Sequence, residues 1–181
     1  MGTTAVRMTV DEFASLPDDD GVKLELIDGE VSEMASGGPV HERVKGKVIR
    51  KLSAFVEIHG LMALVQSETR YYLGTGGIYQ PDVSVVLGDT LDPKHEGKIT
   101  IAPDLAIEVV SSESADQLNH KVNDLLASGM RAVVVIYPTD RQVLIHREDA
   151  IERVPASGTL RLEDVLPGFV LPVAAIFAGL L

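Results

Sequence analysis

Apolar side chains recur at helical spacing in two long stretches of the chain. The first opens after the turn sequence 36–39 and ends at Gly60, with apolar positions Val40, Val44, Val48, Leu52, Phe55 and Val56. The second begins at Ser114, where Gln117 completes a capping box, and runs to Gly129, with apolar positions Leu118, Val122, Leu125 and Leu126. We therefore expect two amphipathic helices. A short helix is expected near the N-terminus, where Thr9 and Glu12 form another capping box.

Between and after these helices the pattern changes to short apolar runs typical of strands. Segments 23–27 and 30–34 flank Asp28-Gly29, a strong hairpin signal. Further strands are expected at 61–66, 69–73, 82–87, 105–110, 132–136 and 142–146. Segment 105–110 is almost entirely apolar, which is typical of a strand covered on both faces. The order of elements predicts an α/β (α+β) fold with a mixed central β-sheet flanked by helices, preceded by an N-terminal helix and hairpin.

Composition narrows the class of protein. The 181 residues fit one domain, 1–181, and a hydrophobic content of 45% excludes a disordered chain. A net charge of −11 argues against non-specific coating of nucleic acid, which depends on cations, but not against a local site built from carboxylates and a metal. There is no secretory signal, and the longest apolar tail, 169–181, is too short to span a membrane. We expect a cytoplasmic protein with no membrane partner.

Glu108 is the first candidate for chemistry, because it interrupts the apolar segment 105–110. A buried carboxylate without a partner costs several kcal/mol, so a cation or hydrogen-bond donors should lie opposite it. The alternative is a glutamate that points off a sheet edge into water.

Asp82 begins another apolar strand directly after Pro81. If segments 82–87 and 105–110 pair antiparallel with residue numbers that sum near 192, Asp82 lies opposite Val110 and diagonal to Glu108. Diagonal neighbours on one face are roughly 7–8 Å apart, so the two carboxylates could share a cation such as Mg²⁺. The alternative is an aspartate that simply opens a strand after proline.

Lys121 lies at the edge of the apolar face of the helix that begins at Ser114. Its ammonium could extend to water, as most such lysines do. Alternatively, it could reach toward Asp82 and Glu108 and stabilise charge on a phosphoryl oxygen.

Pro81-Asp82, Glu108 and a nearby lysine resemble the PD-(D/E)XK nuclease superfamily, and the chain is similar to its Uma-type family of restriction endonuclease-like proteins. The segments that carry the resemblance are 24–30, 41–42, 81–86, 103–111, 129–130, 137–138 and 166–169, together with Lys121. One departure from the superfamily pattern is Val110, which stands where a lysine normally follows Glu108 by two residues.

The resemblance implies a restriction endonuclease-like core that cleaves DNA. Asp82 and Glu108 would bind Mg²⁺ or Mn²⁺ with help from the carbonyl of Val109, and Lys121 would assist the attacking water. DNA is the implied substrate, and a homodimer is the candidate assembly. The competing hypothesis is a non-catalytic module that keeps the nuclease fold as a dimerisation or partner-binding scaffold.

Two further residues are supporting candidates. Glu25 alternates with Leu24 and Leu26, which favours a solvent-facing position, although its place in the family motif implies a side chain near the metal. His41 opens the long helix, where a neutral imidazole could bind a metal or a phosphate, or could be an ordinary first-turn residue.

Charge is unevenly distributed along the chain. Nine acids and one base fall between residues 11 and 33, which suggests that this segment lies away from DNA. The long helix instead carries five cations within nine residues, which form either a solvated face or a contact with a phosphate backbone: Arg43, Lys45, Lys47, Arg50 and Lys51.

Overall fold

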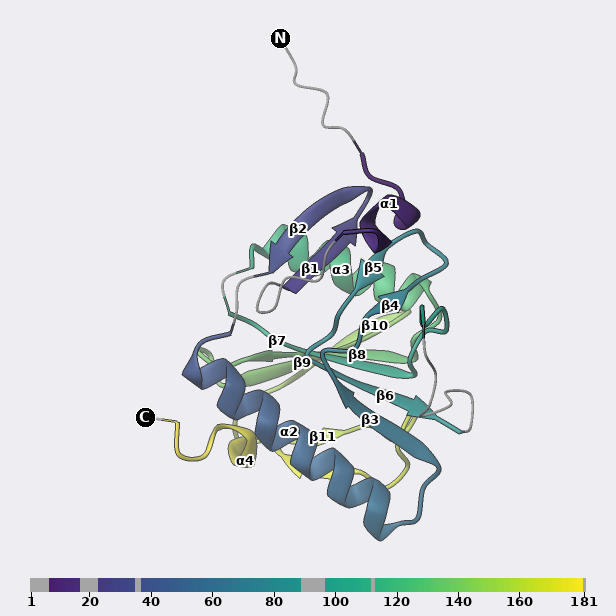
Figure 1. Cartoon of the computed structure of the whole chain (residues 1–181). Coiled ribbons are helices and arrows are strands. Elements are labelled where there is room, and N and C mark those ends of the chain that lie inside the picture. The colour runs from purple at the N-terminus through teal and green to yellow at the C-terminus, as the bar shows by residue number, and fades with distance from the viewer. Residues whose placement is uncertain (1–6, 17–22, 35–36, 89–96, 112, 181) are drawn as a thin grey trace.

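The computed structural model describes residues 7–16, 23–34, 37–88, 97–111 and 113–180, so Ser36 of the expected helix start lies outside the described residues. Its centre is a six-stranded sheet with the strand order β10-β9-β8-β7-β6-β3 (Figure 1). The strands are β3 (Ala63–Ser67), β6 (Val83–Leu87), β7 (Leu105–Val109), β8 (Ala132–Tyr137), β9 (Gln142–Arg147) and β10 (Ala150–Val154). Only the pair β7 and β8 is parallel in this sheet. The predicted mixed sheet flanked by helices is therefore confirmed.

The two long helices cover opposite faces of this sheet. On one face, α2 (Pro39–Ile58) packs with Val44, Val48 and Leu52 against residues such as Ile107 of β7. The same core includes β11 (Thr159–Arg161), β12 (Val170–Pro172) and α4 (Val173–Phe177). On the other face, α3 (Ala115–Ala127) packs against Ala106 and two valines of β8. Because side chains alternate along β7, Glu108 shares the face of Ala106 and points toward α3.

Local sequence signals explain where α3 begins and ends. Ser114 accepts a hydrogen bond from the amide of Gln117, and the Gln117 side chain accepts one from the amide of Ser114. The helix ends at Ala127, and Gly129 follows with φ +99°, a conformation that glycine adopts without strain. The expected capping box and glycine stop are both confirmed.

A second, four-stranded sheet with the order β2-β1-β5-β4 lies in front of α3 in Figure 1. It contains the predicted hairpin of β1 (Lys23–Ile27) and β2 (Glu30–Met34), and the short strands β4 (Tyr71–Tyr72) and β5 (Ile78–Tyr79). The expected strand at 69–73 is thus reduced to two residues, and β5 was not expected. The predicted N-terminal helix is α1 (Val10–Ala14), whose Phe13 packs against Leu26 and Ile78.

None of the helices in the described part of the chain combines the length and the apolar character needed to cross a bilayer.

Candidate functional site

Asp82 and Glu108 lie side by side where β6 and β7 pair. The register aligns Val83 with Ile107, so paired residue numbers sum to 190. One step further along both strands, Asp82 comes level with Glu108, on the same face of the sheet. The expected sum near 192, with Asp82 opposite Val110, is wrong by two residues. The correction brings the two carboxylates closer than the diagonal arrangement would.

Lys121 connects Glu108 to the N-terminal hairpin. Its Nζ lies 2.8 Å from Glu108 Oε1 and 2.8 Å from Glu25 Oε1. All three residues are at most 2% exposed. Glu25 Oε1 also accepts a hydrogen bond of 2.8 Å from the amide of Gln80. Of the two alternatives for Lys121, the structure shows the one in which it reaches toward the carboxylates, through its contact with Glu108.

Glu25 is therefore buried, and the expectation of a solvent-facing side chain is wrong. The alternation rule fails here because both faces of β1 are covered: Leu26 packs toward α1, while Glu25 points toward α3. The hairpin that carries Glu25 belongs to the acidic segment 11–33, so this part of the segment contributes a carboxylate to the cluster.

The cation beside Asp82 is Lys23, not Lys121. Lys23 Nζ lies 3.1 Å from Asp82 Oδ1, while Oδ2 accepts hydrogen bonds from His41 Nε2 at 2.9 Å and from the amide of Val109 at 2.8 Å. Burial opposes ionisation of Asp82, but the hydrogen bond from His41 and the charge of Lys23 outweigh it and hold the pKa well below its usual range. Asp82 is therefore a carboxylate at neutral pH.

Burial acts differently on the other ionisable groups of the cluster. It raises the pKa of Glu108, and the charge of Lys121 opposes this rise. Burial would lower the pKa of Lys121, but the carboxylates of Glu108 and Glu25 outweigh it and raise that pKa well above its usual value. Lys121 is therefore an ammonium, fixed between two acidic side chains.

A closed network of hydrogen bonds and ion pairs begins at the side chain of Asp82 and returns to its main chain. The second ring nitrogen of His41 lies 3.2 Å from Glu42, and Lys45 bridges Glu42 at 2.8 Å and Glu68 at 2.9 Å. The amide of Glu68 returns to the main chain of Asp82, whose carbonyl oxygen it contacts at 3.3 Å. The hydrogen bond to Asp82 raises the pKa of His41. This network therefore favours a positively charged imidazole of His41 beside the Asp82 carboxylate.

Comparison with known proteins places this arrangement in a family. Residues 10–174 match the sequence model of a family, Uma2, described as "Putative restriction endonuclease". The chain belongs to the Uma2 family. It also has the fold of an Anabaena variabilis protein described as a "putative nuclease belonging to DUF820", with a TM-score of 0.85 and 22% sequence identity over 96% of this chain and 99% of that one. No curated protein gives a significant match. The restriction endonuclease-like fold inferred from the motifs is confirmed.

Sequence reasoning missed three members of this buried cluster and its surroundings: Lys23, Lys45 and Glu68. Lys23 precedes Glu25 by two residues in a strand, so both point to the same face, and this spacing was a usable signal. Lys45 was one of the five helix cations expected either on a solvated face or in contact with a phosphate backbone. Instead it is buried between Glu42 and Glu68, and no local pattern marks Glu68 as its partner.

Restriction endonuclease-like families typically use divalent metals, and the donor chemistry here suits one. Mg²⁺ takes oxygen ligands and often needs only one or two carboxylates, with waters completing its shell. Asp82 and Glu108 supply two adjacent carboxylates, and Glu25 Oε2 is buried without a hydrogen-bond partner. Among the described residues, however, no group of three or more histidine, aspartate or glutamate side chains is arranged to enclose a metal. The contact of Val109 with Asp82 is made by its amide, and its carbonyl as a ligand stays a prediction.

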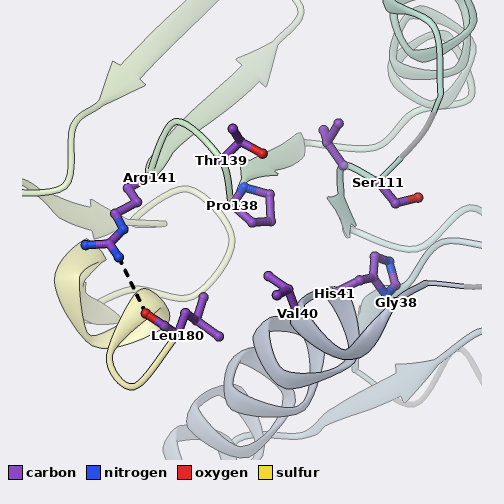
Figure 2. A pocket seen from close by; sticks show the side chains of 9 residues that line it. Gly38, Val40, His41, Ser111, Pro138, Thr139, Arg141 and Leu180 are labelled. Carbon is purple, nitrogen blue, oxygen red and sulfur yellow. Dashed lines mark hydrogen bonds between the residues drawn. The ribbon is translucent and has the colours of Figure 1, made fainter.

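Two cavities adjoin the cluster. A small one, with space of about 10 Å³ for the centre of a water molecule, is lined by Glu25, Glu108 and Lys121 among others. A larger cleft of about 410 Å³ reaches His41 from the other side and is lined also by Ser111 and Arg141 (Figure 2). His41 thus lies between the buried cluster and a cleft large enough for a small ligand.

Only some of the five cations of α2 form the solvated face that the sequence suggested. Lys47 donates to the carbonyls of Ile176 and Ala178, and Arg43 donates to that of Gly179 at 3.2 Å. These two side chains thus hold the C-terminal segment against α2. Arg50 and Lys51 are exposed.

Proposed function

We propose that this Uma2-family protein is an endonuclease that hydrolyses phosphodiester bonds of DNA with Mg²⁺ or Mn²⁺, using Asp82, Glu108 and Lys121. The observation that carries the proposal is the convergence of these three residues, from the start of β6, from β7 and from α3, in one buried cluster next to a cleft: Asp82 directly precedes β6. Carboxylates with strongly perturbed pKa values and a fixed ammonium are typical of catalytic sites.

Each residue has a distinct role in this proposal. Asp82 and Glu108 would hold the metal, aided by the Val109 carbonyl. When bound, the metal supplies Lewis acidity toward a phosphate oxygen and lowers the pKa of its bound water. Lys121 is held as an ammonium, so it would stabilise negative charge on the phosphoryl group rather than accept a proton.

Glu25 and His41 support these groups. Glu25 would hold the Lys121 ammonium in place by its hydrogen bond of 2.8 Å, together with the ion pair of Lys121 with Glu108. His41 orients the Asp82 carboxylate and presents positive charge to the cleft.

Cleavage of plasmid and single-stranded DNA, with Mg²⁺ or Mn²⁺, tests the proposal. Asp82→Asn and Glu108→Gln should each lower the rate at least about 100-fold, since a metal contributes several kcal/mol to such reactions. Glu57→Gln, an equivalent change on the exposed face of α2, should leave the rate unchanged. Equal activity in all four proteins would refute the proposed site.

One observation favours a second candidate function, the non-catalytic scaffold. Both oxygens of Asp82 are already bonded, to Lys23, His41 and Val109, so a metal must displace at least one of them. A thermal-shift titration with Mg²⁺ and Mn²⁺ separates the candidates. A metal site stabilises the wild type and not Asp82→Asn, whereas a scaffold shows no shift that depends on Asp82 and no DNA cleavage.

The proposal takes DNA as the partner, the cytoplasm as the compartment and residues 1–181 as one domain. A homodimer is the expected assembly, which sedimentation analysis of the purified protein tests directly.

A further inference from the structure

The cleft of about 410 Å³ differs in the charge of its lining residues from the acidic chain as a whole. Its walls come from the first turn of α2, the residues after β7, the turn between β8 and β9, and Leu180. Among the described residues that line it, the ionisable side chains are His41 and Arg141, and there is no carboxylate. His41 is paired with Asp82 and Glu42, which leaves Arg141 as the charge that faces the cleft. In a chain with a net charge of −11, an arginine in a cleft lined by no carboxylate points to an anionic ligand.

Arg141 supplies a fixed positive charge at one end of this cleft. Its backbone has φ +49°, a left-handed conformation in which arginine is uncommon and asparagine or glycine is favoured. Its Nη2 donates to the carbonyl of Leu180 at 3.4 Å, a long hydrogen bond that uses one of the five N–H donors of the guanidinium. The remaining donors suit a phosphate, which arginine binds through paired hydrogen bonds.

The middle of the cleft is lined by apolar side chains. Figure 2 shows Val40 and Pro138 between Arg141 at one end and Ser111 with His41 at the other. The Ser111 hydroxyl donates to Glu113 at 3.3 Å, so a carboxylate lies just behind this end of the cleft. His41 in turn contacts Asp82 at 2.9 Å, which joins the cleft to the buried cluster. An apolar stretch with polar ends matches a sugar–phosphate unit, whose deoxyribose carbons lie between charged phosphates.

We infer that this cleft binds the nucleotide next to the scissile bond, with Arg141 holding the neighbouring backbone phosphate. The inference rests on the proposed function, because it places the scissile phosphate at the cluster behind His41. The volume of the cleft falls within the range of roughly 300–1,000 Å³ that is typical of small-ligand sites. Arg141 thus binds the DNA strand, whereas the metal and the attacking water belong to the buried cluster of Asp82 and Glu108.

Fluorescence anisotropy with a short labelled oligothymidylate, in EDTA so that no strand is cut, tests this inference. Arg141→Asn should weaken binding about tenfold, the loss expected for one charge-assisted hydrogen bond, and should reduce the salt dependence by about 0.7 in log K against log salt. Arg141→Lys, which keeps the charge, should restore the salt dependence. Arg161→Asn on β11, outside the cleft, is the matched control and should change binding less than twofold, an effect of long-range charge alone.

The thermal midpoint separates binding from folding. Because asparagine suits the left-handed position, Arg141→Asn should melt at or above the wild-type temperature while it binds the strand more weakly. Unchanged affinity and salt dependence in Arg141→Asn would overturn the inference. Inorganic phosphate is a second probe: if it binds through Arg141 while the oligothymidylate does not, the cleft is a site for free phosphate and the inference is also overturned.

The cleavage assay with Asp82→Asn and Glu108→Gln distinguishes the two proposals. If these variants lose activity and Arg141→Asn binds normally, the proposed function stands and the strand site fails. If the wild type never cuts DNA yet binds it through Arg141, the proposed function fails and the cleft remains a strand-binding site.

Discussion

Replacing Lys121 with methionine removes the one ammonium that contacts both Glu25 and Glu108. Methionine keeps much of the length and apolar volume of the side chain, so packing changes little and the loss is mainly electrostatic. The two ion pairs of 2.8 Å are lost together, and both carboxylates are buried. The free energy of unfolding of this variant therefore shows what it costs to bury Glu25 and Glu108 without their cation.

The expected loss is large. Breaking a buried ion pair by removing one partner costs about 3–5 kcal/mol, because a charge is left uncompensated. Burial already raises the pKa of Glu108, and Lys121 is the principal influence that lowers it, so in Lys121→Met the folded-state pKa rises further. Between the unfolded value near 4.3 and this raised value, the folded state binds more protons than the unfolded state. The free energy of unfolding therefore falls as pH rises through this window, by about 1.4 kcal/mol per pH unit and proton.

Urea unfolding followed by circular dichroism, over a series of pH values, measures this penalty. The full loss should appear above the raised pKa and shrink as the solution is acidified. The matched control is Lys98→Met, because Lys98 also has an ion pair of 2.9 Å, with Asp11, but is 43% exposed. That variant should lose less than about 1 kcal/mol. A loss in Lys121→Met as small as in the control, and independent of pH, would refute the buried electrostatic triad.

Two further predictions concern His41. Its pKa is raised chiefly by the hydrogen bond to Asp82, so NMR titration should find it above the usual value in the wild type and lower in Asp82→Asn; equal values would contradict that bond. A Cβ added at Gly37 would collide with the His41 ring, whereas one added at Gly38 meets nothing within 4 Å. Gly37→Ala should thus lose about 1–3 kcal/mol by denaturant unfolding and shift the His41 signals, and Gly38→Ala should lose less than about 1 kcal/mol; equal losses would contradict the close approach.

The sequence predicted the fold well where the signal is local. Capping boxes at Thr9 and Ser114 and the glycine at 129 set helix limits that the structure confirms, because each acts within one helical turn. The two-residue strand β5 carries too few residues for any periodicity, and it forms by pairing with β4 on one side and with Leu26 of the hairpin on the other.

The register of β6 and β7 shows why the site was predicted only in part. The amide of Asp104 donates to the carbonyl of Val85, and the Asp104 carboxylate accepts a hydrogen bond from the amide of Leu87. These contacts pair the two strands two residues away from the expected register. Asp82 and Glu108 are neighbours, as the sequence predicted. The cations beside them, Lys23 and Lys121, come from β1 and α3, and the spacing of residues along the chain does not predict contacts between such distant elements.

The pairing of Glu25 with Lys121 joins residues 96 positions apart in the chain. During synthesis, a chain that has emerged only as far as β7 contains Glu25, Asp82 and Glu108 but not the ammonium of Lys121. Burying that acidic group would be costly, so the cluster closes only after α3 has left the ribosome. Any chemistry that needs all of these residues therefore requires a chain that extends through α3, and a product truncated before Lys121 lacks it.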